Sequence, residues 1–273
     1  MIKIIKEELF RLRKSSILKS SLIITVIIAL AVIGSQYYYF KHDTAIISFD
    51  IIWFYTIVLG FFIAIFISLF TGSDFTSRTI NYKIISGYKR ITIYLSYLVI
   101  GIIFGILCLF TYITLVLLLG LFFMKGTSLS SYQIFILLIE NILLIITYSS
   151  LFTLLTVLFG DKTLSVVIST ILVFGLTILC FIMLDRLKEE EYIKQYNIMN
   201  NGVQEVLVNN PNYLTGDKRK MYELTTDILP MGTAIRISNL SILERDNIIL
   251  YYGLLIITFN TLGIIILNKK ELR

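Results

Sequence analysis

The sequence predicts an all-α membrane protein with six transmembrane helices. Hydrophobic residues make up 57% of the chain and charged residues only 15%, whereas a soluble domain carries about 25% charged residues. Six stretches lack Asp, Glu, Lys, Arg and His, and each reaches the roughly 20 residues that a spanning helix needs. Their lengths therefore predict six spans, at 20–40, 51–73, 91–124, 141–160, 163–184 and 247–268. The third stretch is long enough that its helix must tilt or extend beyond the bilayer.

Residues 1–19 predict an amphipathic helix that lies on the membrane surface. Its apolar residues recur at helical spacing, at Ile2, Ile5, Leu9 and Leu12. Its basic residues would contact lipid head groups, at Lys3, Lys6, Arg13 and Lys14. The alternative is a solvated helical lead-in to the first span.

Basic residues are distributed unequally between the two sides of the predicted membrane. With the N-terminus inside, the inside segments carry 14 Lys and Arg against 5 Asp and Glu, whereas the outside segments carry 10 against 12. Short loops rich in Lys and Arg stay cytoplasmic, so both termini are expected in the cytoplasm and the protein in the plasma membrane. The net charge of +6 then reflects contact with membrane lipid, and no nucleic acid is needed to explain it.

Residues 185–246 form a long polar segment between the fifth and sixth spans. This segment holds 18 Asp, Glu, Lys and Arg residues and both prolines of the chain, Pro211 and Pro230. Helices are expected at 185–199 and 217–229, with turn-forming residues between them at 209–216. The chain is thus divided into residues 1–184, the extracellular helical segment 185–246, and residues 247–273 with the last span and a cytoplasmic tail.

The sequence contains no evident catalytic, metal or nucleotide site. The phosphate-binding pattern G-x-x-x-x-G-K-[ST] is absent, and the stretch GDKT at 160–163 reads as a tight cytoplasmic turn. The single histidine, His42, has no Cys or His near it in the sequence, so neither a metal site nor a Ser/His/Asp triad is expected. The chain is expected to be no enzyme and to bind no cofactor itself.

Glu140 is the one ionisable residue expected within the membrane region. Such residues are costly and often functional, so one interpretation gives Glu140 a role in a transport pathway. The other makes it a structural partner for Lys125 or for a neighbouring helix.

The connector between the second and third spans, residues 72–90, is basic and carries regularly spaced apolar residues. Phe75, Thr79, Tyr82 and Ile85 or Ser86 are expected on one face of a single helix that Gly87 ends. A short helix at the membrane surface can transmit force from a cytoplasmic partner to both adjoining spans. The alternative is a passive amphipathic connector, which is common in membrane proteins.

The stretch GSDFTSRTINYKIISGYKRITIYLSYL resembles the segment after the second span in ABC transporter permeases of the type 2 exporter class. The matching positions are Asp74, Arg78, Thr79, Ile80, Ile84, Ile85, Gly87, Arg90, Ile93, Tyr94 and Ser96. The likeness continues at 209–232 and at 266–273, which are similar to a Firmicutes-type subgroup related to peptide-antibiotic export and immunity permeases. Two features depart from the pattern: Asp74 stands where many members carry Glu, and the external segment is enlarged.

The resemblance implies a larger machine with two permease chains, identical or paired with a sister chain. Two separate ATPase subunits would carry ATP and Mg and would dock on the connector. The contact residues implied are Asp74, Phe75, Arg78, Thr79, Tyr82, Ile84 and Ile85. The external helices would form a lid over the exit, and the scarcity of charge in the spans favours an amphipathic peptide or lipid-like cargo.

Two other functional classes stay open at this point. The sizeable external segment is also compatible with a subunit that senses an extracellular peptide and signals to a partner histidine kinase, and the chain could be a scaffold without transport. A secondary transporter is less favoured, because the spans contain few ionisable residues and no evident inverted repeat.

Overall fold

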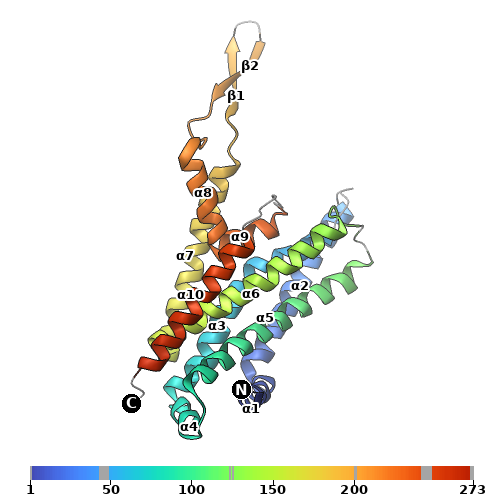
Figure 1. The fold of residues 1–273 in the computed structure, drawn as a ribbon. Coiled ribbons are helices and arrows are strands. Elements are labelled where there is room, and N and C mark those ends of the chain that lie inside the picture. Colours follow the sequence, from blue (N-terminus) through green and yellow to red (C-terminus); the bar gives the residue numbers. More distant parts are fainter. Residues whose placement is uncertain are drawn as a thin grey trace.

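The computed structural model describes residues 2–42, 49–122, 124, 126–199, 202–240 and 248–270. Within them, six helices are long and apolar enough to cross a membrane (Figure 1). These six candidate spans agree with the expected number and suggest a multi-pass membrane protein. The six helices are α2 (Ser16–His42), α3 (Tyr55–Thr76), α5 (Arg90–Gly120), α6 (Ser131–Phe159), α7 (Lys162–Lys188) and α10 (Ile248–Lys269).

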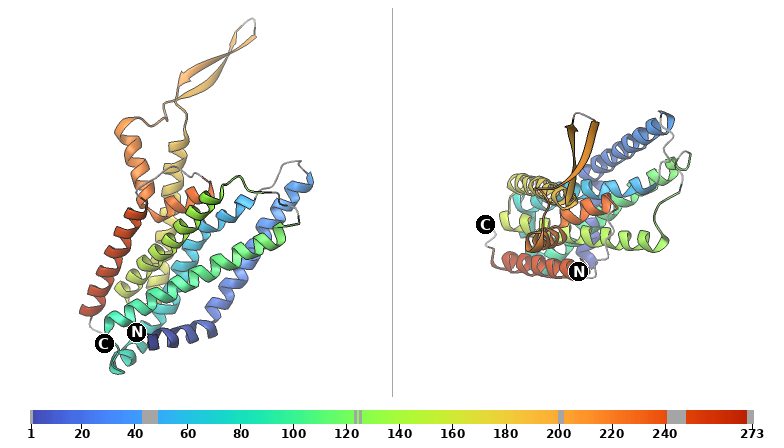
Figure 2. Two further views of the ribbon diagram at one scale, coloured as in Figure 1. Left: turned by 45° about the vertical axis from the view of Figure 1, so that its right-hand side comes forward. Right: turned by 90° about the horizontal axis from the view of Figure 1, so that it is seen from above.

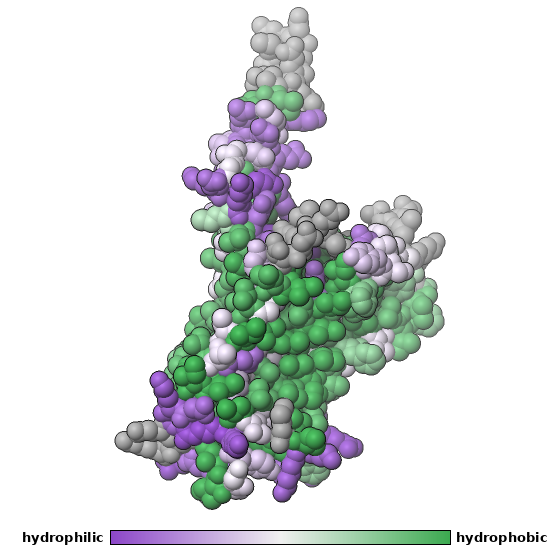
Figure 3. Space-filling model, in the orientation of Figure 1, coloured by the Kyte–Doolittle hydropathy of each residue, from purple (hydrophilic) through white to green (hydrophobic). Residues whose placement is uncertain are grey.

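The long helices expose a broad apolar surface that lies between more hydrophilic ends of the molecule (Figure 3). On α7, for example, Ile171 and Phe174 are exposed, and so is Ile257 on α10. Exposed apolar side chains over the whole length of several helices are expected where lipid surrounds the protein. The third span, α5, has 31 residues and is therefore about 46 Å long, which exceeds the roughly 30 Å hydrocarbon core.

Helix α3 is central to the bundle and packs against α5, α6 and α7. A 3₁₀ turn, η1 (Phe49–Phe54), leads into it. Aromatic side chains join α3 to α5: the rings of Phe66 and Phe104 stack with centroids 3.8 Å apart, and those of Tyr55 and Tyr112 stack at 4.5 Å. A movement of one end of α3 would therefore reach most of the bundle.

Two short helices, α1 (Ile2–Lys14) and α4 (Thr79–Ile85), lie at the end of the bundle where both termini are found (Figures 1 and 2). A separate N-terminal helix is confirmed, and it ends where the Ser15 hydroxyl bonds the Leu12 carbonyl. Its buried face differs from the expected one. Ile4, Glu8 and Leu12 are buried, whereas Ile2 is 74% exposed.

The external segment is a hairpin followed by two helices, and the expected helix over 185–199 is wrong. Helix α7 ends at Lys188, and strands β1 (Tyr192–Met199) and β2 (Gly202–Asn209) pair antiparallel with Tyr192 opposite Asn209. Both strands are rich in β-branched and aromatic residues, which favour strands. The hairpin projects far beyond the long helices (Figures 1 and 2).

The second expected helix of this segment is confirmed as α8 (Gly216–Ile228). Pro230 follows the end of α8 and also occupies the first turn of a further helix, α9 (Pro230–Ser238). Helix α9 is almost wholly buried against α3, α6, α7 and α8. Gly232 permits the tight approach to α8, since a Cβ atom there would lie 2.1 Å from the Thr226 carbonyl oxygen.

A buried arginine fastens α9 to α8. Arg236 forms an ion pair with Asp227 and donates a hydrogen bond to the Thr226 hydroxyl. Burial lowers the pKa of Arg236 to about 10, so the guanidinium stays protonated at neutral pH.

An Arg236→Ala variant is expected to lower the free energy of unfolding by about 2 kcal/mol, because Asp227 and Thr226 both lose a buried charged donor. Thermal denaturation in detergent measures this loss. Arg219→Ala is the matched control, because Arg219 is half-exposed and its contacts are weak: an i,i+4 pair with Glu223, a 3.4 Å hydrogen bond to the Leu187 carbonyl oxygen and a contact with the Tyr213 ring. Exposed i,i+4 pairs contribute about 0.3–0.5 kcal/mol, so a smaller loss is expected. Equal losses in both variants would contradict the role given to Arg236.

Candidate coupling surface

The connector between α3 and α4 is a sharp elbow. Helix α3 ends at Thr76, and Arg78 adopts a left-handed backbone with φ 58° before α4 begins at Thr79. The Ser77 hydroxyl donates to the Ser73 carbonyl oxygen at 2.6 Å and lies 2.7 Å from the Thr79 hydroxyl. The single helix expected across this connector is therefore wrong, because the chain breaks at Ser77 and Arg78.

The far end of α4 follows the expectation. Helix α4 ends at Ile85, and Gly87 has φ 90°. Only glycine adopts this conformation without strain, so the chain turns there and enters α5 through Lys89, whose backbone is extended.

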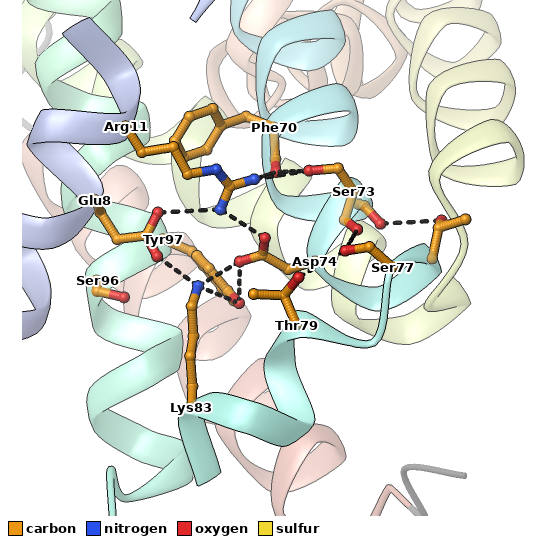
Figure 4. Close-up of polar contacts among 12 residues, drawn as sticks. Glu8, Arg11, Phe70, Ser73, Asp74, Ser77, Thr79, Lys83, Ser96 and Tyr97 are labelled. Atoms are coloured by element: carbon orange, nitrogen blue, oxygen red, sulfur yellow. Dashed lines mark hydrogen bonds and ion pairs between the residues drawn. The ribbon is translucent and has the colours of Figure 1, made fainter. Parts of the chain in front are cut away.

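Five polar side chains from four helices form a buried charge cluster beneath the elbow (Figure 4). The Arg11 Nη1 atom lies 2.6 Å from Asp74 Oδ1 and 3.3 Å from Glu8 Oε2. The Lys83 ammonium forms ion pairs with both carboxylates. The Tyr97 hydroxyl donates to Asp74 Oδ2 at 2.8 Å. The charge cluster thus consists of Glu8, Arg11, Asp74, Lys83 and Tyr97.

The charges of this cluster balance, with two carboxylates against two cations. The Glu8 and Asp74 side chains are only 3% and 2% exposed, whereas Arg11 is 34% exposed. Buried charges are tolerated when they are paired and hydrogen-bonded, and each carboxylate here contacts both cations. Removal of one member leaves an uncompensated buried charge. The cluster therefore holds α1, α3, α4 and α5 in one arrangement.

A second set of contacts ties the start of α5 to the C-terminal end of α10. The Arg90 Nη1 atom donates to the carbonyl oxygens of Leu267, Asn268 and Lys270 at 2.7–2.8 Å. The Lys270 ammonium in turn donates to the Val157 and Leu158 carbonyl oxygens at the end of α6. Partial burial lowers the pKa of Lys270. The last carbonyl groups of a helix have no partner within the helix. At the ends of α10 and α6, basic side chains donate hydrogen bonds to these groups.

An Arg90→Ala variant is expected to fray the C-terminal turn of α10 and to lower the free energy of unfolding by about 2 kcal/mol, because three carbonyl groups lose a charged donor. Hydrogen exchange of the amides of residues 264–270 measures the fraying. Lys89→Ala is the control, since Lys89 is an exposed neighbour of the same charge and should leave exchange unchanged. Unchanged exchange in Arg90→Ala would contradict the assignment.

The seven residues expected to contact a cytoplasmic partner do not share one surface. Asp74 and Phe75 are 1% and 8% exposed, so both belong to the interior: Asp74 to the charge cluster and Phe75 to the packing around Ile80. Thr79 and Ile84 are half-buried. The three exposed residues, with Tyr82 68% and Ile85 80% exposed, define the coupling surface: Arg78, Tyr82 and Ile85.

Glu140 lies far from this surface. It is half-buried on α6, ten residues after the Ser130 cap, and about 29 Å of helix separates it from the other end of α6 at Phe159. Among the described residues Glu140 has no ionic partner, and Lys125 lies outside them. Its neighbour Asn141 accepts a hydrogen bond at 2.9 Å from the Thr56 hydroxyl of α3, a buried contact that the sequence analysis did not single out.

Sequence reasoning also missed four of the five residues of the charge cluster: Glu8, Arg11, Lys83 and Tyr97. One signal was present. Glu8 lies four residues from Ile4 and from Leu12, so it falls on the apolar face of its helix, where an acidic residue requires a buried partner. Its partners could not be named, because they are distant in the sequence.

The described residues contain no group of three or more His, Cys, Asp or Glu side chains that could hold a metal ion. No family model matches the chain, and no curated protein is significantly similar to it.

Proposed function

We propose that this chain is the membrane-spanning, non-catalytic permease subunit of an ATP-driven exporter of the ABC type 2 class. Separate ATPase subunits would bind ATP and Mg and would dock on the coupling surface. The observation that carries the proposal is the pair of exposed apolar side chains, Tyr82 and Ile85, on a short helix that buried ion pairs hold rigidly to the spans. An exposed aromatic and aliphatic pair on a polar end of the molecule is typical of a protein interface.

Force applied to α4 has two routes into the bundle. Lys83 connects α4 to Asp74 at the end of the central helix α3 and to Glu8 on α1. Arg90 connects the start of α5 to the end of α10. Because these contacts are buried or multiple, α4 would move as one body with the ends of α1, α3 and α5. The proposal thus assigns Asp74 and Phe75 to transmission and the coupling surface to contact.

The proposed machine contains two ATPase subunits and two permease chains, identical or different, in the plasma membrane. Both termini would lie in the cytoplasm, because α1 and α4 occupy the end of the bundle that carries the basic excess. The cargo would be an amphipathic peptide or lipid-like compound, moved out of the cell or membrane, and resistance to an antimicrobial peptide is one such role. The mostly apolar spans support cargo of this kind.

The projecting hairpin favours a second candidate function, an extracellular sensor that signals to a partner histidine kinase. Tyr192 and Leu207 are 50% and 65% exposed on it, so a peptide could contact them. A sensor of this kind needs a kinase as its partner, whereas an exporter needs an ATPase.

Purification of the tagged chain from its native membrane, with identification of the co-purifying subunits, tests the proposal. Recovery of an ATPase in equal amount to the chain is the expected result. Recovery of a histidine kinase without an ATPase would favour the sensor, and recovery of neither would count against both. A Tyr82→Asp/Ile85→Asp variant, purified in parallel, should lose the ATPase.

A further inference from the structure

A pocket of about 520 Å³ opens beside α1. Helix α1 lies at the end of the bundle where both termini are found (Figure 1). Side chains from α1, α3 and α7 line it together with Ser15 and the start of α2. Three of its lining residues are basic, Arg11, Lys14 and Lys162, and none is acidic. The charged side chains that line the pocket are therefore all basic, although Arg11 is paired within the charge cluster.

The other walls of this pocket are apolar. They include Phe10 of α1 together with Leu69 and Phe70 of α3. A ligand that satisfies both kinds of wall carries an anionic group and a hydrocarbon part. A free inorganic anion would satisfy only the basic side chains.

Two of the three cations are available to a ligand. Arg11 is already paired with the carboxylates of the charge cluster. It also lines the pocket, where it donates a hydrogen bond to the Ser73 hydroxyl at 2.7 Å. Among the described residues, Lys14 and Lys162 form no ion pair, and both are exposed. The Lys14 ammonium rests on the Phe10 ring, 4.3 Å from its centroid, which is a contact that a phosphate could replace or share.

The fold places Lys162 at this pocket through a close contact between α3 and α7. A Cβ atom at Gly72 would lie 2.8 Å from the Lys162 Cα atom, so only glycine allows this approach without a shift. The Lys162 backbone N–H donates to the Thr76 hydroxyl at 3.1 Å, and Asp161, the nearest acid in the sequence, accepts from the Leu164 N–H. The carboxylate of Asp161 is thus engaged in capping α7.

The pocket also lies at the ends of three helices that could span the membrane. It is built where α2 begins at Ser16, where α7 begins at Lys162 and where α3 approaches its end at Thr76. Basic side chains at the ends of spans lie at the level of the phosphates, and basic pockets between transmembrane helices bind anionic head groups.

We propose that this pocket binds one anionic phospholipid. Lys14 and Lys162 contact the phosphate, the hydroxyl of Ser73 lies beside it, and the first part of an acyl chain lies against Leu69 and Phe70. Because Arg11 belongs to both the pocket and the charge cluster, the bound lipid adds negative charge next to the contact that fixes α1.

The site is tested with the purified full-length protein in phosphatidylcholine nanodiscs that contain a small fraction of spin-labelled phosphatidylglycerol. The wild-type protein is expected to immobilise the labelled lipid, and a Lys14→Gln/Lys162→Gln variant to bind it roughly 30-fold more weakly, since each lysine contributes a separate attraction. Lys3→Gln/Lys6→Gln removes the same charge from exposed positions of α1 outside the pocket and should weaken the binding far less. Lys14→Arg/Lys162→Arg should also retain binding, which shows that charge is what matters.

Three results would overturn the proposal. Equal weakening in the Lys14/Lys162 and Lys3/Lys6 variants would indicate diffuse attraction to the surface. Unchanged binding in the Lys14/Lys162 variant would place the lipid elsewhere. Displacement of the labelled lipid by glycerophosphate, at concentrations no higher than those at which phosphatidylglycerol displaces it, would show that the pocket recognises a free phosphate and makes no use of its apolar walls.

Discussion

An Asp74→Asn variant is expected to unfold about 3 kcal/mol more easily than the wild type. Asp74 is 1% exposed and meets Arg11, Lys83 and the Tyr97 hydroxyl. Without its charge, two cations face the single carboxylate of Glu8, and an uncompensated buried charge typically costs 3–5 kcal/mol. We place the effect at the low end because Arg11 is 34% exposed and water screens part of its charge.

Thermal or denaturant unfolding of the purified protein in detergent measures this effect. Asp217→Asn is the matched control, because Asp217 is an exposed acidic residue in the first turn of α8. Its substitution should change the free energy of unfolding by no more than about 0.5 kcal/mol. Equal stability of the Asp74→Asn protein and the wild type would show that the charge cluster does not hold the elbow.

A Tyr82→Asp/Ile85→Asp variant is expected to lose about 100-fold in affinity for the proposed ATPase while its own stability stays nearly unchanged. Both side chains are largely exposed, so their substitution removes little packing from the folded chain. At an interface, a buried aromatic or aliphatic anchor commonly contributes 2 kcal/mol or more, and two introduced carboxylates would in addition be desolvated without partners.

This prediction is measured as the binding of the ATPase to the chain in nanodiscs and as the stimulation of its ATP hydrolysis. A matched control exists on α8, where Met221→Asp and Leu224→Asp alter two exposed apolar residues at the same spacing but at the other end of the molecule. The control should bind the ATPase normally. Substitution of Ile84 is a less clean test, because Ile84 packs against the buried residues around Phe75, and its loss would also destabilise the elbow.

The spans were predictable because lipid imposes a simple rule: a spanning helix excludes charge over about 20 residues. The residues at which these helices begin and end were less predictable. Helix α6 begins at Ser131, ten residues before the charge-free stretch at 141–160, because a glutamate near the membrane interface does not end a helix. The capping box of Ser130 and Gln133 marks the true start.

The hairpin was missed because local composition gave opposite signals. The run of glutamates after α7 favours a helix, and the β-branched and aromatic residues of 192–209 favour strands. A pair of strands also needs two segments to align in register, and a single stretch of sequence does not reveal its partner.

The charge cluster could not be assembled from the sequence, because its members lie on four helices. Glu8 and Lys83 are 75 positions apart, and Arg11 and Asp74 are 63 apart. The position of the elbow between α3 and α5 agrees with the sequence, but its exposed face agrees only in part: Tyr82 and Ile85 are exposed, whereas Phe75 is buried. The chain breaks at Ser77 and Arg78, and the left-handed backbone of Arg78 changes the direction of α4. This change of direction decides which side chains of α4 face inward.

The central claim, that a cytoplasmic ATPase contacts this chain through α4, is tested most directly by cross-linking in the native membrane. A photo-activatable amino acid is introduced at Ile85 and, as the control, at Leu138, an exposed residue of the long helix α6. The account predicts that position 85 forms an adduct with a nucleotide-binding subunit and that position 138 does not. Absence of such an adduct at position 85, together with labelling of a cysteine at that position by a membrane-impermeant reagent applied from outside the cell, would contradict it.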